Sequence, residues 1–258
     1  MDAKEQYCAF RAIVDKEVTR ILRIWMQTLL PSAITMALYF IIFGKFIGSQ
    51  VRDINGFSYM QLIVPGIIML SVITNSFTNV VSTFFSAKFQ RSIEELLVSP
   101  TPNYIIILGY VASGVFRGLL VGIIVMLASL LFFAQLHIYN LAIVIAFILL
   151  TSLVFSLGGL LNAIFAKRFD DISIIPTFVL MPLTYLGGVF YSIKLLPEFW
   201  QTISLFNPIL YMVNGFRYGF LGISDINIWI GLGMLIVFAA VLFYLNLYLI
   251  KKGVGLRT

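Results

Sequence analysis

The chain alternates long apolar runs with short polar stretches, and six of the runs are as long as a membrane-spanning helix. A helix that crosses the hydrocarbon of a bilayer needs about 20 apolar residues, because it rises about 1.5 Å per residue. The pattern therefore predicts an all-α membrane protein with six transmembrane helices. The six runs cover residues 24–43, 59–85, 104–133, 141–165, 172–191 and 228–250.

The first 23 residues follow another pattern, in which apolar side chains recur every three or four positions and charged side chains fill the opposite face. This period predicts an amphipathic helix that lies in the membrane interface. A soluble helix packed on a partner protein would have the same period. We expect an interfacial helix at 1–23, a six-helix domain at 24–250 and a short tail at 251–258.

Residues 195–222 are apolar enough to enter a bilayer, but Pro197, Asn207 and Pro208 interrupt them. Irregular backbone at membrane depth needs protein or water around it, because lipid offers no hydrogen bonds. We therefore predict two short helices that enter the membrane from the outer side and return to it. A seventh span is the alternative.

Composition supports a membrane protein. Hydrophobic residues make up 60% of the chain, charged residues only 11%, and the mean hydropathy is +1.02. A soluble globular domain has about 25% charged residues. Lipid is therefore expected to cover most of the surface.

The 17 Lys and Arg residues predict the orientation of the chain. Five precede the first apolar run, two lie in each of the stretches 86–103 and 166–171, and three follow the last run. Since Lys and Arg accumulate in cytoplasmic loops, we expect both termini in the cytoplasm. The net charge of +6 belongs to these loops, and no basic stripe with interleaved aromatic residues indicates nucleic-acid binding.

Motifs for self-contained chemistry are missing from the sequence. There is no G-x-x-x-x-G-K-[ST] phosphate loop, and none of the 11 acidic residues falls within an apolar run. The single histidine, His137, lies in a loop, and the pairs Glu94–Glu95 and Asp170–Asp171 lie beside basic residues. We predict no catalytic, cofactor-binding or metal-binding residue in this chain.

A transporter without a phosphate loop or intramembrane acids must take its energy from a partner protein. Two other classes stay open on the residues alone. One is an ion-coupled or facilitative carrier, and the other is a membrane-embedded enzyme that modifies lipids.

The polar stretch between the second and third runs predicts a short charged helix at about residues 88–100. It reads K-F-Q-R-S-I-E-E-L-L-V-S-P, with Leu96 and Leu97 on one side and Pro100 at its end. An apolar edge with charged flanks suits docking on a soluble domain, although an ordinary loop helix would have the same features. An arginine followed by E-x-L-L-x-S-P, at this place among six spans, resembles the coupling segment of type-2 ABC exporter permeases.

A second match to that family lies toward the C-terminus. Proline, glycine, asparagine and arginine residues follow one another there in an order similar to the family's signature. They are Pro182, Gly187, Gly188, Pro197, Asn207, Pro208 and Arg217.

The resemblance implies a homodimer or a pseudo-symmetric dimer of permeases, bound to two copies of a separate ABC ATPase subunit, which would hold ATP and Mg. It implies export of a glycan, lipid or hydrophobic small molecule across a bacterial inner membrane, along a dimer interface lined by the first, second and fifth spans. The outer signature residues from Gly187 to Arg217 would form a re-entrant gate. The residues that would contact the ATPase are Arg91, Glu94, Glu95, Leu96, Leu97 and Pro100.

One basic residue, Arg117, lies within the third apolar run. An unpaired charge in lipid is unfavourable, so Arg117 should face a polar pathway or extend toward the cytoplasmic interface. Gly114, Gly118 and Gly122 repeat at every fourth position beside it. Small residues at this spacing let helices approach closely, either within one chain, which we favour, or at a dimer seam.

Overall fold

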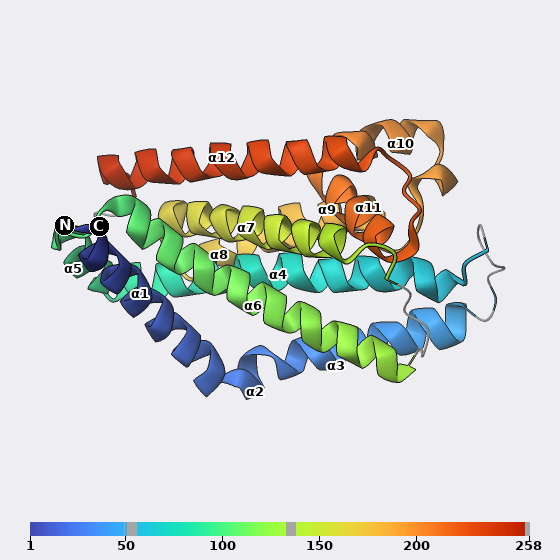
Figure 1. Ribbon diagram of the computed structural model, residues 1–258, viewed down its shortest axis with the longest axis horizontal. Helices are drawn as coiled ribbons and strands as arrows, with labels where there is room; N and C mark the ends of the chain where they lie inside the picture. The colour runs from blue at the N-terminus through green and yellow to red at the C-terminus, as the bar shows by residue number, and fades with distance from the viewer. Residues whose placement is uncertain (49, 51–55, 133–137, 256–258) are drawn as a thin grey trace.

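The computed structural model describes residues 1–48, 50, 56–132 and 138–255, and within these ranges the chain forms helices and no strand element. The long helices lie side by side in an elongated bundle (Figure 1). The start of α1 and the end of α12 lie at the same end of the bundle, beside α5. Below, this end is called the basic end. His137 and Arg257 lie outside the described residues.

The N-terminal segment forms α1 (Ala3–Arg23), which begins with a capping contact from the Asp2 backbone N–H to the Glu5 carboxylate (2.9 Å). It continues through α2 (Trp25–Thr28), α3 (Leu30–Tyr39) and η1 (Phe40–Ile47). The axis of α1 slopes away from the bundle axis, and the chain bends at α2 (Figure 1). Pro31 lies in the first turn of α3, where it lacks only an N–H that would be free in any case.

The central helix is α4 (Tyr59–Phe89), and most of its side chains are buried. It packs along α6 (Asn103–Phe132) and α7 (Leu141–Phe165), which also pack on each other. Its N-cap Ser58 accepts a hydrogen bond from the Gln61 N–H, and Asn140 caps α7 in the same way. A helix that is apolar on all sides is buried when its neighbours surround it, as α4 is here.

The predicted run 172–191 folds into three consecutive short helices, α8 (Asp171–Ile175), η2 (Pro176–Leu180) and α9 (Met181–Leu186). Together they form one apolar helix, Asp171–Leu186, which is shorter than the usual length of a membrane-spanning helix. Pro176 and Pro182 lack a backbone N–H, so regular α-helical bonding is interrupted there. Five helices in the described part of the chain are long and apolar enough to cross a membrane, where the sequence predicted six.

After α9 the chain forms η3 (Ile193–Leu195), α10 (Glu198–Leu205) and α11 (Pro208–Leu221). The predicted stretch 195–222 therefore contains two short helices. Helix α11 is largely buried and packs on α4, α7 and α12 (Ile228–Lys252). Helices α10 and α11 lie at the end of the bundle opposite α5, which is called the far end below (Figure 1).

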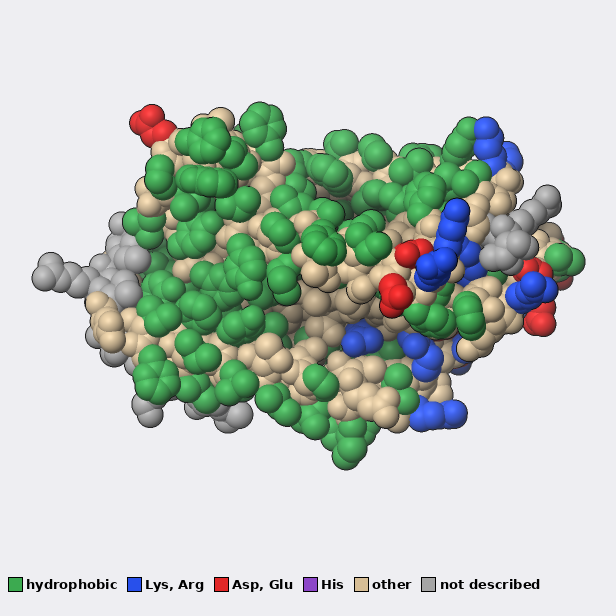
Figure 2. All heavy atoms as spheres, turned by 180° about the vertical axis from the view of Figure 1, so that it is seen from behind, with side chains coloured by type: hydrophobic (Ala, Val, Ile, Leu, Met, Phe, Trp, Pro, Cys, Tyr) green, Lys and Arg blue, Asp and Glu red, His purple; other side chains and the backbone are tan. Residues whose placement is uncertain are grey.

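Apolar and basic side chains occupy different regions of the surface. Figure 2 shows hydrophobic side chains spread over most of the visible face, with Lys and Arg gathered toward the basic end. Exposed apolar side chains occur on α3, α7 and α12 in particular. An apolar belt of this extent on a folded chain indicates contact with lipid or with other membrane helices.

Candidate functional site

The short helix α5 (Ser92–Val98) lies at the basic end, directly after α4. Arg91 forms the turn between the two helices with φ of 60°, a left-handed conformation that side chains rarely adopt. This turn separates α5 from α4, so the predicted segment 88–100 is one helix of seven residues flanked by the end of α4 and by Pro100.

Apolar side chains of α5 are divided between the core and the surface. Leu96 and Leu97 are half-buried against the core of the same chain, whereas Glu94 and Glu95 are exposed. Val98 is 87% exposed. The apolar part of α5 that is free to meet a partner is therefore Val98, which sequence reasoning did not single out.

Aromatic side chains join the α4–α5 turn to the loop before α8. The ring of Phe169 lies 4.9 Å from that of Phe89 and 5.0 Å from that of Phe85, measured between centroids. Phe89 and Phe169 are also exposed, at 64% and 50%. The exposed apolar side chains Phe89, Val98 and Phe169, from the end of α4, from α5 and from the loop before α8, are called the α5 surface below.

The lysine at the end of α4 connects this helix to the end of α7. Lys88 is buried, and its Nζ donates hydrogen bonds to the carbonyl oxygens of Ile164 (2.9 Å) and Ala166 (2.6 Å). These carbonyls belong to the last turn of α7, where backbone acceptors lack helical partners. Lys88 thus ties the end of α4 to the end of α7.

Arg117 on α6 lies in a polar cluster that connects α1, α2, α4 and α6. Its Nη2 donates to the carbonyl oxygen of Thr28 (3.2 Å) and to Asn75 Oδ1 (3.3 Å), and its Nη1 donates to Asn79 Oδ1 (3.5 Å). Arg20 Nη2 donates to the same Asn79 oxygen (3.3 Å). The guanidinium group is thus enclosed between helices of its own chain.

The three glycines of α6 face α4 and α7. A Cβ atom on Gly114 would collide with Ser156 and Val80, one on Gly118 would collide with Ser76, and one on Gly122 would come within 3.0 Å of Val72. These contacts lie within one chain. The glycines therefore permit the close packing of α6 against its two neighbours.

A groove of about 250 Å³ opens between α3, α4 and the α8–η2–α9 segment. Its described lining carries no charged side chain and is rich in hydroxyl groups among apolar ones. Thr74 is exposed there, although most of α4 is buried. Sequence reasoning did not identify these residues, since isolated threonines have no distinctive spacing. The threonines that line the groove are Thr35, Thr74, Thr78, Thr177 and Thr184.

At the far end, Arg217 is buried and fastens α11 to two other segments. Its Nε donates to the carbonyl oxygen of Leu62 (3.2 Å) and its Nη2 to that of Gly188 (2.6 Å). Gly188 has φ of 69°, a conformation that glycine adopts without strain. Asn207 caps α11 and donates to the carbonyl oxygen of Leu183 (2.6 Å), which ties α11 to α9 as well.

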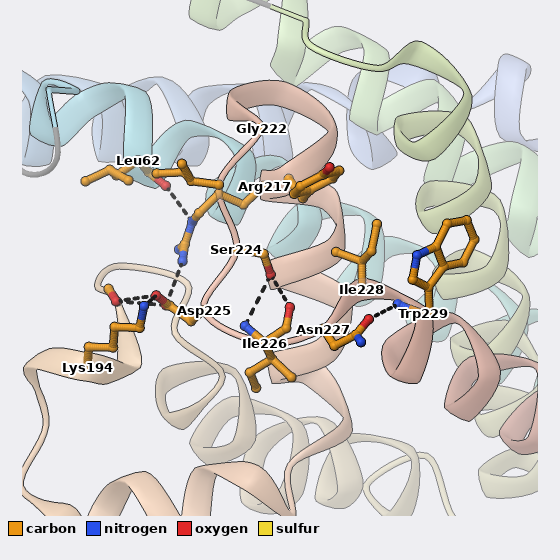
Figure 3. A pocket seen from close by; sticks show the side chains of 13 residues that line it. Leu62, Lys194, Arg217, Gly222, Ser224, Asp225, Ile226, Asn227, Ile228 and Trp229 are labelled. Carbon is orange, nitrogen blue, oxygen red and sulfur yellow. Dashed lines mark hydrogen bonds and ion pairs between the residues drawn. The ribbon is translucent and has the colours of Figure 1, made fainter.

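Asp225 lies opposite Arg217 on the wall of a pocket of about 510 Å³ (Figure 3). Its carboxylate accepts hydrogen bonds from Ser192 Oγ (2.8 and 2.9 Å) and lies 3.8 Å from both Arg217 Nη1 and Lys194 Nζ. The charged side chains on the pocket wall are thus paired with one another. Pro197 and Gly187, also predicted at this end, lie before α10 and after α9.

Comparison with known proteins identifies relatives over nearly the whole chain. Residues 9–221 match the ABC-2 type transporter family. The chain is 58% identical over 252 residues to the inner membrane transport permease YadH of Escherichia coli K12, covering 98% of each chain, and to the protein of the same name in Shigella flexneri. It is 24% identical to nodulation protein J of Rhizobium leguminosarum bv. viciae, covering 88% of each chain.

Proposed function

The chain belongs to the ABC-2 type transporter family, and from this premise we propose that it is the membrane subunit of an exporter driven by ATP hydrolysis on a separate ATPase subunit. It is a transport permease of the inner membrane and not an enzyme, as its family and its relatives of 58% identity indicate. Family membership thus removes the alternative of a lipid-modifying enzyme.

The proposed contact with the ATPase is α5 together with the α5 surface. The observation that carries this proposal is that Val98, Phe89 and Phe169 are exposed near the α4–α5 turn, and that Glu94 and Glu95 of α5 are exposed as well. An apolar centre with charged residues at its rim is the usual composition of a protein interface. Of the residues inferred from the family resemblance, Leu96 and Leu97 would support α5 from inside.

Motion of the ATPase would reach the membrane through α4 and α7. Helix α5 is joined to α4 by only two residues, Gln90 and the left-handed Arg91, and Lys88 hydrogen-bonds the end of α7. A rigid-body movement of α5 would therefore displace both long helices together. ATP and Mg would be held by the ATPase, two copies of which would bind a permease dimer.

We further propose six spans, with the short α8–η2–α9 segment as the fifth, and both termini in the cytoplasm. A short span is accommodated by local thinning of the bilayer or by association with other helices. The Lys and Arg residues at the basic end support a cytoplasmic location for that end. Helices α10 and α11 would then enter the membrane from the outer side.

The translocation path would lie along the groove between α3, α4 and α8–η2–α9, closed by a second copy of the chain. Residues of α9 that border it are strongly exposed in one copy, including Met181 at 54% and Tyr185 at 50%. Hydroxyl and apolar groups without charge suit an amphipathic or neutral cargo. A glycan, a lipid and a hydrophobic small molecule all fit this description.

Charge reversal on α5 tests the proposal. The chain would be co-expressed with its ABC ATPase subunit, purified through a tag on the permease, and assayed for retained ATPase and for ATP hydrolysis. Glu94→Lys with Glu95→Lys should reduce ATPase retention at least about tenfold, because repulsion replaces complementary charge at the rim. The matched control is Glu198→Lys at the far end, which should retain the ATPase normally.

Two results would contradict the proposal. One is normal ATPase retention and hydrolysis in the Glu94→Lys, Glu95→Lys variant. The other is transport by the purified permease in liposomes without any ATPase, which would instead favour an ion-coupled or facilitative carrier.

A further inference from the structure

The polar cluster between α1 and α6 contains more positive than negative charge. Arg20 and Arg117 reach it from different helices and both donate to Asn79 Oδ1, at 3.3 and 3.5 Å. Glu17 is buried and pairs with Arg20 at 3.2 Å. Among the described residues, Arg117 has no acidic partner, so the cluster has an excess of one positive charge.

Arg117 is also incompletely hydrogen-bonded. Its Nε is buried and has no hydrogen-bond partner in the described part of the chain. Its other contacts are neutral oxygens of Thr28, Asn75 and Asn79. A partly buried guanidinium without a counter-ion is unfavourable, unless an anion supplies the missing negative charge.

The cluster lies next to side chains that are suited to lipid. Leu22, Trp25 and Met26, at the junction of α1 and α2, are exposed by 50%, 48% and 62%. The Arg20 side chain is 38% exposed and shares the Asn79 oxygen with the partly buried Arg117, so it lies between this apolar junction and Arg117. The headgroup of a lipid whose acyl chains contact the junction would meet Arg20 first and Arg117 behind it.

We propose that Arg20 and Arg117 form a binding site for a phosphate-bearing anion, supplied by the headgroup of an acidic lipid in the leaflet next to α1. A guanidinium group donates paired N–H bonds to phosphate oxygens, and it keeps its charge when buried. One phosphodiester would balance the excess charge of the cluster. Bound there, the lipid would hold α1 and the α2 bend against α6.

The test is thermal unfolding of the purified full-length chain in detergent micelles, titrated with phosphatidylglycerol or with phosphatidylcholine. Phosphatidylglycerol should raise the unfolding midpoint of the wild type, and phosphatidylcholine should not. Arg117→Gln and Arg20→Gln should each weaken the apparent affinity for phosphatidylglycerol at least about tenfold, the effect of losing a charged hydrogen bond. Arg23→Gln, on an exposed arginine of the same helix, is the matched control and should titrate as the wild type does.

Parallel titration with inorganic pyrophosphate separates the two sources of phosphate. Pyrophosphate could shift the unfolding midpoint in a way that depends on Arg117 while phosphatidylglycerol does not. This result would overturn the assignment to lipid and indicate a site for a water-soluble phosphate. If phosphatidylglycerol shifts the unfolding midpoint equally in the wild type and in all three variants, Arg20 and Arg117 do not form the site. If Arg117→Gln does not fold, Arg20→Gln, whose side chain is partly exposed, gives the same decision.

Discussion

Buried basic residues of this permease are held mainly by backbone carbonyl groups. Lys88 donates to two carbonyls at the end of α7, and Arg217 donates to those of Leu62 and Gly188. Lys88 thereby satisfies acceptors at the end of α7, whereas Arg217 donates to a carbonyl in the first turn of α4 and to one in the turn after α9. Lys88 and Arg217 therefore join segments that are distant in the sequence.

Replacing Lys88 should destabilise the bundle. In Lys88→Met the two α7 carbonyls lose their donor, so the free energy of unfolding should fall by about 1–3 kcal/mol. Thermal or denaturant unfolding in micelles measures this change. Lys167→Met, on an exposed lysine of the neighbouring loop, is the control. Equal unfolding midpoints for the two variants would show that Lys88 does not cap α7.

At the scale of elements, the turn at Arg91 sets the direction of α5. A left-handed backbone is unfavourable by roughly 1–2 kcal/mol for a residue other than glycine, and more so for a β-branched one. Arg91→Gly should therefore unfold at the same or a higher temperature than the wild type, whereas Arg91→Val should unfold at a lower one. The opposite order would contradict the left-handed turn.

Close contact between α4 and the segment after α9 depends on Gly66. A Cβ atom at this position would collide with the carbonyl oxygen of Val189, which is backbone and cannot rotate away. Gly66→Ala should therefore lower the free energy of unfolding by about 1–3 kcal/mol. Gly233→Ala on α12, where a Cβ would meet nothing within 4 Å, should be neutral or slightly stabilising. Equal losses of stability in the two variants would argue against this packing.

For the whole molecule, the sequence predicted long helices well because lipid requires unbroken apolar runs. The run 141–165 coincides with α7, and the run 59–85 lies within α4. The fifth run was predicted as one regular spanning helix, but it forms a shorter, interrupted one. Its mean hydropathy gave no sign that Pro176 and Pro182 interrupt the helical hydrogen bonding. The helical structure of such a segment therefore depends on where its prolines lie as well as on its hydropathy.

The candidate sites were only partly accessible from sequence. The charges of α5 could be read directly, but the exposure of Val98 and Phe169 depends on which apolar faces the bundle covers. Likewise, no periodicity places Glu17 and Arg20 beside Arg117, which is nearly a hundred residues away in the chain. Contacts between distant segments determine both sites, and a single sequence does not record them.

The central claim, that α5 is the contact with a separate ATPase, can be tested directly by cross-linking. Cys8 is the only cysteine of the chain, so Cys8→Ser provides a background without thiols. In that background, Val98→Cys and Glu198→Cys place a single exposed thiol at the basic end and the far end. The thiol would be labelled with a short maleimide that carries a photoreactive diazirine, which on illumination inserts into whatever residue lies next to it. In membranes that contain the ATPase we predict a permease–ATPase product for Val98→Cys and none for Glu198→Cys. Absence of the Val98→Cys product in membranes where the two proteins still co-purify would contradict the claim.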